Sequence, residues 1–548
     1  MRRLFISPRT LALLGAATLI ASTIVAYHPV WHGGFIWDDD RYVTHNYLLV
    51  APDGLRRIWF SLDAPSQYFP LTYTVLRVER ALWDLHPSGY HWTNILLHLA
   101  NAFLVWALLA RLKVPGAWLA AAIFALHPIQ VESVAWISEL KNVLMGFFFL
   151  LTLIAWTIYV DLRSNGRRAF YLAALVCCLF ALCAKSTACT LPAALLLILW
   201  LKKKPIRVRT LLDIAPFAGL ALGVGLLAIW WEKYHQGTRM LASLAPLDRL
   251  LIASRAVWFY LGKIFWPAKL TFIYPQWQID ATNPIAYLWL IAAILLIAAI
   301  CYARRHFGRG VEVAILFFLT TLAPLLGFIM LYTFRYTFVA DHYQYLASIG
   351  PIALVSAGLV TFGRSSENRR WLVAGASVAI LICLELLTWR QSATYRDAET
   401  LWRTTISKNP DCWMAYNNLG VLEVQKDEIN EAIDNYERSL RLHPDYPEAH
   451  YNLGSALLQK GQIDEAIEQC EKALKLQPSD PDAHVVLGNA FMAKQDIDRA
   501  ISQYEQALNL HPEDSNAHYN LGMALQQKGE TERAAGEFEK ARQYESRD

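Results

Sequence analysis

The chain has 548 residues, of which 55% are hydrophobic and 18% charged, and its mean hydropathy is positive. This composition excludes an ordinary soluble globular protein and predicts a polytopic membrane protein. The charge is split unevenly, because residues 1–410 carry 20 acidic and 37 basic side chains and residues 411–548 carry 26 and 13. A basic membrane part therefore precedes an acidic soluble tail, and we expect no nucleic-acid partner.

The first predicted span is Leu11 to Val30, which follows Met1-Arg2-Arg3 and Arg9. We interpret it as an uncleaved anchor with a cytoplasmic N-terminus. Residues 31–90 form an outer loop with amphipathic helices on the bilayer surface. Further spans are predicted at 91–110, 114–135, 138–160, 169–184, 187–201, 211–231, 284–303, 311–331, 344–362 and 371–389.

Residues 248–270 resemble a span but contain four basic side chains, so we predict a re-entrant or interfacial helix pair there. The count is then eleven spans, and the basic loops between them fall on the cytoplasmic side. An odd count places the tail on the same outer side as loop 31–90. We assign residues 1–392 to the membrane domain.

The tail repeats itself every 34 residues. The repeated positions are the prolines Pro410, Pro444, Pro478 and Pro512, the pairs Leu419-Gly420, Leu453-Gly454, Leu487-Gly488 and Leu521-Gly522, the alanines Ala432, Ala466, Ala500 and Ala534, and the large residues Tyr436, Cys470, Tyr504 and Phe538. This is the tetratricopeptide (TPR) pattern, in which Gly and Ala allow paired helices to approach closely. We predict four full repeats over 411–548, joined to the membrane domain by a half-repeat at 393–410.

Three consecutive carboxylates, Asp38 to Asp40, lie directly after the first predicted span. Charges close to the hydrocarbon boundary are rare and usually functional. We therefore interpret Asp38 and Asp39 as candidates for a catalytic carboxylate and Asp40 as a substrate contact. The alternative is an N-cap cluster that opens a solvated surface helix, because Asp favours caps and turns.

Two other polar groups are expected on the outer side. His127-Pro128 stops the third predicted span, and Glu132 follows it. His127 and Glu132 would contact a sugar or an acceptor, or would simply cap a Pro-terminated helix. Lys185 interrupts an apolar hairpin and would bind a lipid phosphate, or would snorkel to the interface.

A third polar group precedes the span at 344–362. Arg335, Asp341, His342 and Tyr345 combine charge with aromatic side chains, which suits a pocket for a sugar or a phosphate. The alternative is an aromatic belt at the membrane interface.

The sequence gives little support for a metal, a disulfide or a nucleotide site. His91 and His98 are seven residues apart without a carboxylate at ligand spacing, so no metal is predicted. The eight Cys residues form no CxxC pair. No Gly-rich phosphate loop or nucleophile elbow is present.

Three asparagines of the tail, Asn418, Asn452 and Asn520, share one position in the first helix of their repeats, and Val486 breaks the series. A line of amides along a groove could bind a peptide backbone without reading its sequence. Solvated polar filler is the alternative.

Several motifs occur together in this chain. They are Phe35-Ile36-Trp37-Asp38-Asp39-Asp40, His127-Pro128 with Glu132-Ser133-Val134-Ala135-Trp136, Ala340-Asp341-His342-Tyr343, and the TPR tail. Together they resemble the transmembrane and tetratricopeptide-repeat-containing protein O-mannosyltransferases and their bacterial relatives, in the GT-C superfamily. The late motif of that family reads acidic-Arg-Tyr. His342 takes the Arg place here, which shifts the expected phosphate contact to Arg335 or Lys185.

The resemblance implies an all-α GT-C helical bundle. It implies inverting transfer of a hexose, mannose in this family, from a polyprenyl or dolichyl phosphate to Ser or Thr hydroxyls of an acceptor polypeptide held by the TPR groove. The donor's lipid tail stays in the membrane and a carboxylate of the first loop takes the hydroxyl proton. The lipid-linked sugar is a substrate, and no cofactor or divalent metal is predicted. Two rival readings are a membrane-anchored TPR scaffold and a transporter, which would place ionisable residues at mid-membrane.

The chain contains no Asn-x-Ser/Thr acceptor sequence, even in its long tail. This absence favours a bacterial inner membrane with a periplasmic tail over the endoplasmic reticulum membrane with a luminal tail.

Overall fold

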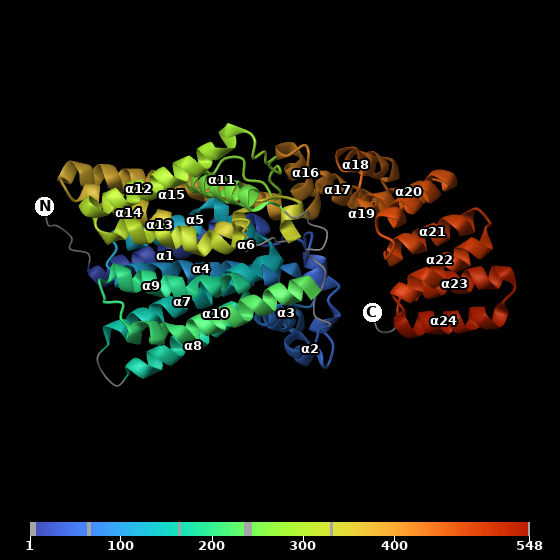
Figure 1. Cartoon of the computed structure of the whole chain (residues 1–548), viewed down its shortest axis with the longest axis horizontal. Helices are drawn as coiled ribbons and strands as arrows, with labels where there is room; N and C mark the ends of the chain where they lie inside the picture. Colours follow the sequence, from blue (N-terminus) through green and yellow to red (C-terminus); the bar gives the residue numbers. More distant parts are fainter. Residues whose placement is uncertain (1–6, 63–66, 163–165, 235–243, 329–331, 546–548) are drawn as a thin grey trace. The chain divides into compact units, whose positions relative to one another are not determined.

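The computed structural model describes residues 7–62, 67–162, 166–234, 244–328 and 332–545 (Figure 1). Met1-Arg2-Arg3 and residues 163–165 of a predicted cytoplasmic loop lie outside the described ranges. Helices and their connections make up the described part of the chain, which contains no strand and confirms the predicted all-α class. The chain divides into two compact units, Met1–Leu401 and Trp402–Asp548.

The first unit is a bundle of apolar helices. Helix α7 is central and packs against both α4 and α8. The helices are α1 Pro8–Ala26, α2 Gly54–Phe60, α3 Pro70–Trp83, α4 Pro87–Arg111, α5 Ala117–Leu126, α6 Val131–Ala135, α7 Leu140–Asp161, α8 Arg167–Ala184, α9 Leu191–Leu201, α10 Val208–Tyr234, α11 Pro246–Phe265, α12 Leu288–Phe307, α13 Arg309–Leu322, α14 Ile349–Gly363 and α15 Glu367–Ser392.

Six helical segments of the described ranges are long and apolar enough to cross a membrane. They are Arg9–Ala26, Pro87–Arg111, Ile137–Asp161, Arg167–Ala184, Val208–Tyr234 and Glu367–Tyr395. Shorter apolar helices occur at Ser186–Leu201, Pro284–Ile300 and Ile349–Gly363. The chain is therefore a membrane protein, while the count of eleven spans stays a prediction.

The predicted span 114–135 is a bent pair rather than one straight helix. Helix α5 ends at Leu126, and a bend of 56° separates it from Pro128–Ala135. Proline has no backbone N–H and clashes with the preceding turn, so Pro128 stops α5 as predicted. Three short helical segments, Pro128–Gln130, α6 Val131–Ala135 and Ile137–Glu139, then precede α7 and carry much of the candidate site.

The prediction of a helix pair over 248–270 was wrong. One helix, α11, continues to Phe265, and an irregular segment follows it. Two of the basic side chains that suggested a break find partners in the irregular segment after the helix. Arg255 lies over the Trp277 ring at 4.4 Å, and the Lys263 ammonium donates to the Ala268 carbonyl at 2.7 Å.

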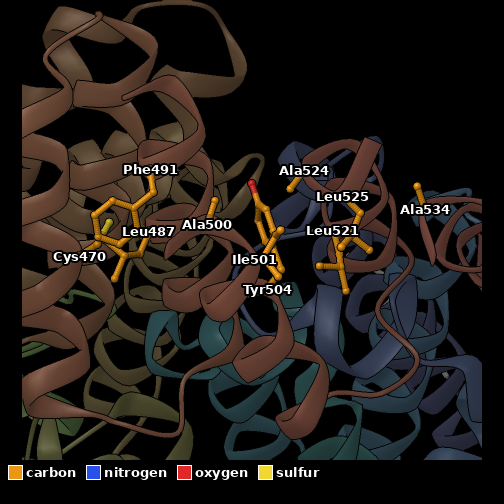
Figure 2. Close-up of a cluster of buried hydrophobic side chains, with 10 residues drawn as sticks. All are labelled: Cys470, Leu487, Phe491, Ala500, Ile501, Tyr504, Leu521, Ala524, Leu525 and Ala534. Atoms are coloured by element: carbon orange, nitrogen blue, oxygen red, sulfur yellow. The ribbon is translucent and has the colours of Figure 1, made fainter. Parts of the chain in front are cut away.

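The second unit contains four helix pairs that match the predicted repeats. The pairs are α17 Trp413–Gln425 with α18 Ile429–Leu442, α19 Pro447–Gln459 with α20 Ile463–Leu476, α21 Pro481–Ala493 with α22 Ile497–Leu510, and α23 Ser515–Lys528 with α24 Thr531–Glu545. Helix α16, Ala398–Lys408, precedes them in the chain. Figure 2 shows the buried side chains, from Cys470 to Ala534, that pack between successive pairs.

The glycine of each repeat faces the large residue of the paired helix, as the pattern predicts. A Cβ atom on Gly454 would lie 2.6 Å from the Cys470 sulfur, and one on Gly488 would lie 2.5 Å from the Tyr504 ring. Gly420 and Gly522 face Tyr436 and Phe538 in the same way. These contacts leave no room for a side chain, so glycine is required at this position.

A histidine bridge that the sequence analysis did not identify also recurs every 34 residues. The Nε2 atoms of His450, His484 and His518 bond to the carbonyl groups of Pro444, Pro478 and Pro512 at 2.9 to 3.2 Å. The Nδ1 atoms bond to Gln469, Gln503 and Glu537 at 2.5 to 2.8 Å. Each histidine thus ties the start of its own repeat to the second helix of the pair.

The turn between paired helices contains one residue with a left-handed backbone in every repeat. It is Gly461 and Gly529 in two repeats, with φ of 81° and 90°, but Asp427 and Gln495 in the others, with φ of 65° and 64°. Glycine adopts this conformation without the steric cost that other residues incur. We expect Gln495→Gly to raise the unfolding free energy of the solenoid by about 1 kcal/mol.

Urea unfolding of the purified chain, followed by hydrogen exchange in α21 and α22, measures this change. Gly461→Gln is the matched control and should lower stability by a similar amount. Equal stability of the wild type and Gln495→Gly would show that the turn carries no strain.

Candidate functional site

The three carboxylates of the loop after α1 occupy three different environments. Asp38 is half-buried, Asp39 is fully buried and Asp40 is exposed. Asp40 accepts a bond from the Arg41 amide at 2.6 Å. The same residue type therefore has three levels of solvent access within three positions, and only Asp38 combines access with a charged neighbourhood.

Asp39 is bonded to the backbone on both sides of its carboxylate. One oxygen, Oδ2, accepts from the Ile36 amide at 2.9 Å, and Oδ1 accepts from the Ser138 amide at 2.8 Å. Burial raises the pKa of Asp39 to about 7, although these two amide donors act in the opposite direction.

Among the described residues, no pair of backbone amides binds the Asp38 carboxylate in this way. The groups that act on Asp38 are charged side chains. Burial raises the pKa of Asp38, while the positive charges of Lys141 and Arg41 oppose that rise. The nearby Glu139 carboxylate also contributes to the higher pKa. A carboxylate whose pKa is raised by burial and by charged neighbours is typical of functional sites.

Glu139 is the centre of a buried charge cluster. Its side chain is 1% exposed, and its two oxygens lie 3.0 Å from the Lys141 ammonium and 3.3 Å from the Lys185 ammonium. The Lys141 ammonium also lies over the Tyr42 ring at 4.6 Å. Burial lowers the pKa of Lys185 to about 8, and Glu139 opposes that change. Glu139 thus faces two lysines, and the carboxylates of Asp38 and Glu132 also act on Lys141 and Lys185.

His342 joins this cluster to Glu132. The Glu132 carboxylate accepts from the His342 backbone amide at 3.1 Å and contacts its Nδ1 at 2.9 Å. The other ring nitrogen, Nε2, lies 3.9 Å from a Glu139 oxygen. Asn142 donates to the His342 carbonyl at 2.8 Å and holds the same segment. Glu132, Lys185 and His342, which were predicted separately, thus come together.

Two other predicted residues lie close to this group. Asp341 is buried and accepts from the Tyr274 hydroxyl at 3.0 and 3.1 Å. Arg335 is half-buried, and its guanidinium lies 6.0 Å from the Tyr336 ring, which contacts Trp37. The Asp341 carboxylate is therefore hydrogen-bonded to a tyrosine. Arg335 lies near Tyr336, one of the rings that contact Trp37 in the first-loop turn.

His127 and Tyr345 bond inside the bundle. Both ring nitrogens of His127 bond to backbone, at 2.9 Å to the Ile264 carbonyl and 3.3 Å to the Ile129 amide. The Tyr345 hydroxyl bonds to His98 and Asn101 at 2.8 and 2.9 Å. These contacts hold helices together, and neither side chain joins the charge cluster.

The three predicted asparagines of the tail are half-buried and bond within the solenoid. Asn418 donates to the Met414 carbonyl at 3.0 Å. Asn452 donates to Asn417 at 3.1 Å, and Asn520 donates to Asn489 at 3.2 Å. The amide groups of Asn452 and Asn520 therefore link helices of neighbouring repeats, whereas the Asn418 amide bonds within its own helix.

The sequence analysis missed Glu139, Lys141, Asn142 and Tyr274. The signal that could have identified the first two was two charges beside the first turn of a strongly apolar segment, Ile137–Asp161. In the described part of the chain, no three His, Cys, Asp or Glu side chains are grouped so that they could hold a metal ion.

A helical membrane bundle with a buried charged site, combined with a TPR solenoid, defines the class of this protein. Tetratricopeptide repeat models match residues 390–434, 422–481 and 488–529. A crystal structure of MamA is 25% identical and covers 29% of this chain and 91% of its own, with a TM-score of 0.26.

The chain is similar to protein O-mannosyl-transferases, which confirms the resemblance that its motifs suggested. Human protein O-mannosyl-transferase TMTC4 is 24% identical over 483 residues, which cover 75% of this chain and 64% of that protein. Protein O-mannosyl-transferase F38B6.6 of Caenorhabditis elegans is 24% identical over 448 residues, 77% of this chain and 62% of that protein. The chain thus spans less than two thirds of these relatives, whose names support a glycosyltransferase-like function.

The buried charge cluster should make stability depend on Glu139. Glu139→Gln would leave two buried lysines without their shared counter-charge, which costs about 3 kcal/mol in comparable buried pairs. We expect a clear drop in the melting temperature of the detergent-solubilised chain. The double variant Glu139→Gln with Lys185→Met should recover part of that loss.

Glu367→Gln, at the exposed start of α15, is the control for the same change of side chain. An equal effect of the two Gln variants would mean that Glu139 does not neutralise the lysines.

Proposed function

We propose that the chain is an integral-membrane glycosyltransferase. It moves a hexose, most simply mannose, from a polyprenyl-phosphate carrier to Ser and Thr hydroxyls of exported proteins. The observation that carries the proposal is Asp38, a half-buried carboxylate whose charge interacts with Lys141 of the buried cluster around Glu139. The names of the similar proteins support the same class of reaction.

Asp38 is the proposed general base. It accepts the proton of the acceptor hydroxyl as that oxygen attacks the anomeric carbon of the sugar. The bond from the anomeric carbon to the phosphate oxygen breaks on the opposite side, so the reaction inverts the configuration. Asp38 suits this role better than Asp39, because backbone amides already occupy both oxygens of Asp39.

Lys141, Lys185 and His342 are the proposed contacts of the leaving lipid phosphate. Lysine binds phosphate as a point charge, and a fixed cation in a site of low dielectric stabilises the charge that develops on the departing oxygen. Glu139 holds the two ammonium groups in place. A phosphate is already a good leaving group, so this arrangement requires no strong general acid.

The TPR solenoid is the proposed acceptor-binding part. Repeats of this kind present an extended groove lined by the first helix of each pair. Asn418, Asn452 and Asn520 lie on those first helices and are half-buried. We propose a bacterial inner membrane as the location, with Asp38 and the solenoid on the periplasmic side.

Asp38→Asn tests the base directly. An amide keeps the shape of the carboxylate but accepts no proton, so we expect transfer to a Thr-rich peptide to fall roughly 10²–10⁴-fold. The assay uses synthetic polyprenyl-phosphate mannose and measures the sugar on the peptide by mass spectrometry.

Asp53→Asn, an exposed position of the same outer loop, is the matched control and should keep wild-type transfer. Full transfer by Asp38→Asn would make this carboxylate structural. The base would then be sought at Glu132 or Asp341.

Truncation after Pro410 tests the role of the solenoid. If the repeats recruit the acceptor, the truncated chain should lose most protein glycosylation and keep hydrolysis of the lipid donor, because water needs no groove. Both activities are measured on the same preparation. Undiminished protein glycosylation would exclude acceptor recruitment by the repeats.

A further inference from the structure

Asp39 connects two segments of chain that are far apart in sequence. Its side chain is fully buried, and its two oxygens accept the amide of Ile36, in its own turn, and the amide of Ser138, before α7. Each oxygen is engaged by a different segment. The carboxylate therefore acts as a bridge between the first outer loop and the turn that leads into α7.

The turn that Asp39 closes has an unusual backbone. Trp37 adopts a left-handed conformation with φ of 43°, which is a true outlier for a bulky residue. Such strain persists where the surrounding structure over-determines it, and it occurs most often at functional sites. Here the Trp37 ring stacks on Trp136 at 5.4 Å and meets the edge of Phe272 at 5.2 Å. The polar bridge and the Trp136 stack hold the same two segments, and Phe272 adds a third segment from beyond α11.

The residues next to this bridge are charged residues of the site. Asp38 precedes Asp39 directly, and Glu139 directly follows Ser138. Glu139 in turn holds the ammonium groups of Lys141 and Lys185. Asp38 and Glu139 therefore each adjoin one end of the bridge. The bridge fixes the distance between Asp38 and the lysines that Glu139 holds.

We propose that Asp39 is a positioning residue that fixes Asp38 against the cationic cluster and takes no proton from the substrate. This inference rests on the proposed function, because it assigns Asp38 as the base. The positioning role follows from the bridge itself, because backbone amides bind both oxygens of the Asp39 carboxylate.

Positions 38 and 39 should therefore respond differently to substitution by Asn. Asn at position 38 removes a base and keeps the shape. Asn at position 39 places an NH₂ group against one of two backbone N–H donors, so one bond of the bridge is lost. Glu at position 39 restores a carboxylate but adds a methylene, which prevents the same fit to both amides.

The experiment uses the purified full-length chain with polyprenyl-phosphate mannose and two acceptors, a Thr-rich peptide and azide. Azide attacks the anomeric carbon without giving up a proton, so glycosyl azide and the lipid phosphate form without a base. We expect Asp38→Asn to lose peptide transfer and to retain azide turnover. We expect Asp39→Asn and Asp39→Glu to lose both activities together, by about 10²-fold, as misplacement of a site does.

Hydrogen exchange at the Ile36 and Ser138 amides provides a readout that needs no activity. Both amides should exchange slowly in the wild type and in Asp38→Asn, and faster in the two Asp39 variants. Asp53→Asn is the control for activity and for melting temperature.

Three outcomes would overturn the inference. One is selective loss of peptide transfer with retained azide turnover in Asp39→Asn, which would make Asp39 the base. Another is unchanged amide exchange in both Asp39 variants. The third is failure of both variants to fold, which would make the bridge a requirement of folding rather than of positioning. A wild type that transfers sugar to neither acceptor would refute the proposed function, while amide exchange would still decide whether the bridge exists.

Discussion

The site depends on the compensation of buried charge around Glu139. Two ammonium groups and one carboxylate, all nearly excluded from solvent, are tolerated in a membrane bundle only when they lie within direct contact of one another. The contact holds Lys141 above the Tyr42 ring and Lys185 at the end of α8, so it joins the first outer loop to two helices. The contact thus fixes two ammonium groups inside the bundle.

The tail could be predicted from the sequence almost completely, because its structure follows a period. Each repeat packs mainly on its neighbours, so the residue at a repeated position meets the same environment each time. Gly454 against Cys470 and Gly488 against Tyr504 show this directly. The His450 bridge has the same period and was still missed, because a histidine in a polar helix gives no signal until its proline carbonyl is located.

The membrane unit was predicted less completely, because its contacts join distant segments. The stop at Pro128 was predictable, since it follows from the missing N–H of proline alone. The role of Tyr345 was not, because its partners His98 and Asn101 lie on a helix some 240 residues earlier in the chain. Glu139 was missed because of its position in the sequence. It lies at the edge of an apolar segment, where a charge is commonly a solvated flank rather than a buried centre.

Asp38 and Asp39 show why the candidate site could be located from sequence but its roles could not be assigned. Both are aspartates beside a membrane span, and composition, spacing and motif treat them alike. Their proposed roles differ because Ser138, 99 residues away, supplies an amide to one carboxylate only. The Asp39 carboxylate is held by one backbone donor on each oxygen, whereas Asp38 is half-buried and interacts with the charge of Lys141. The environment, rather than the residue type, separates an anchor from a base.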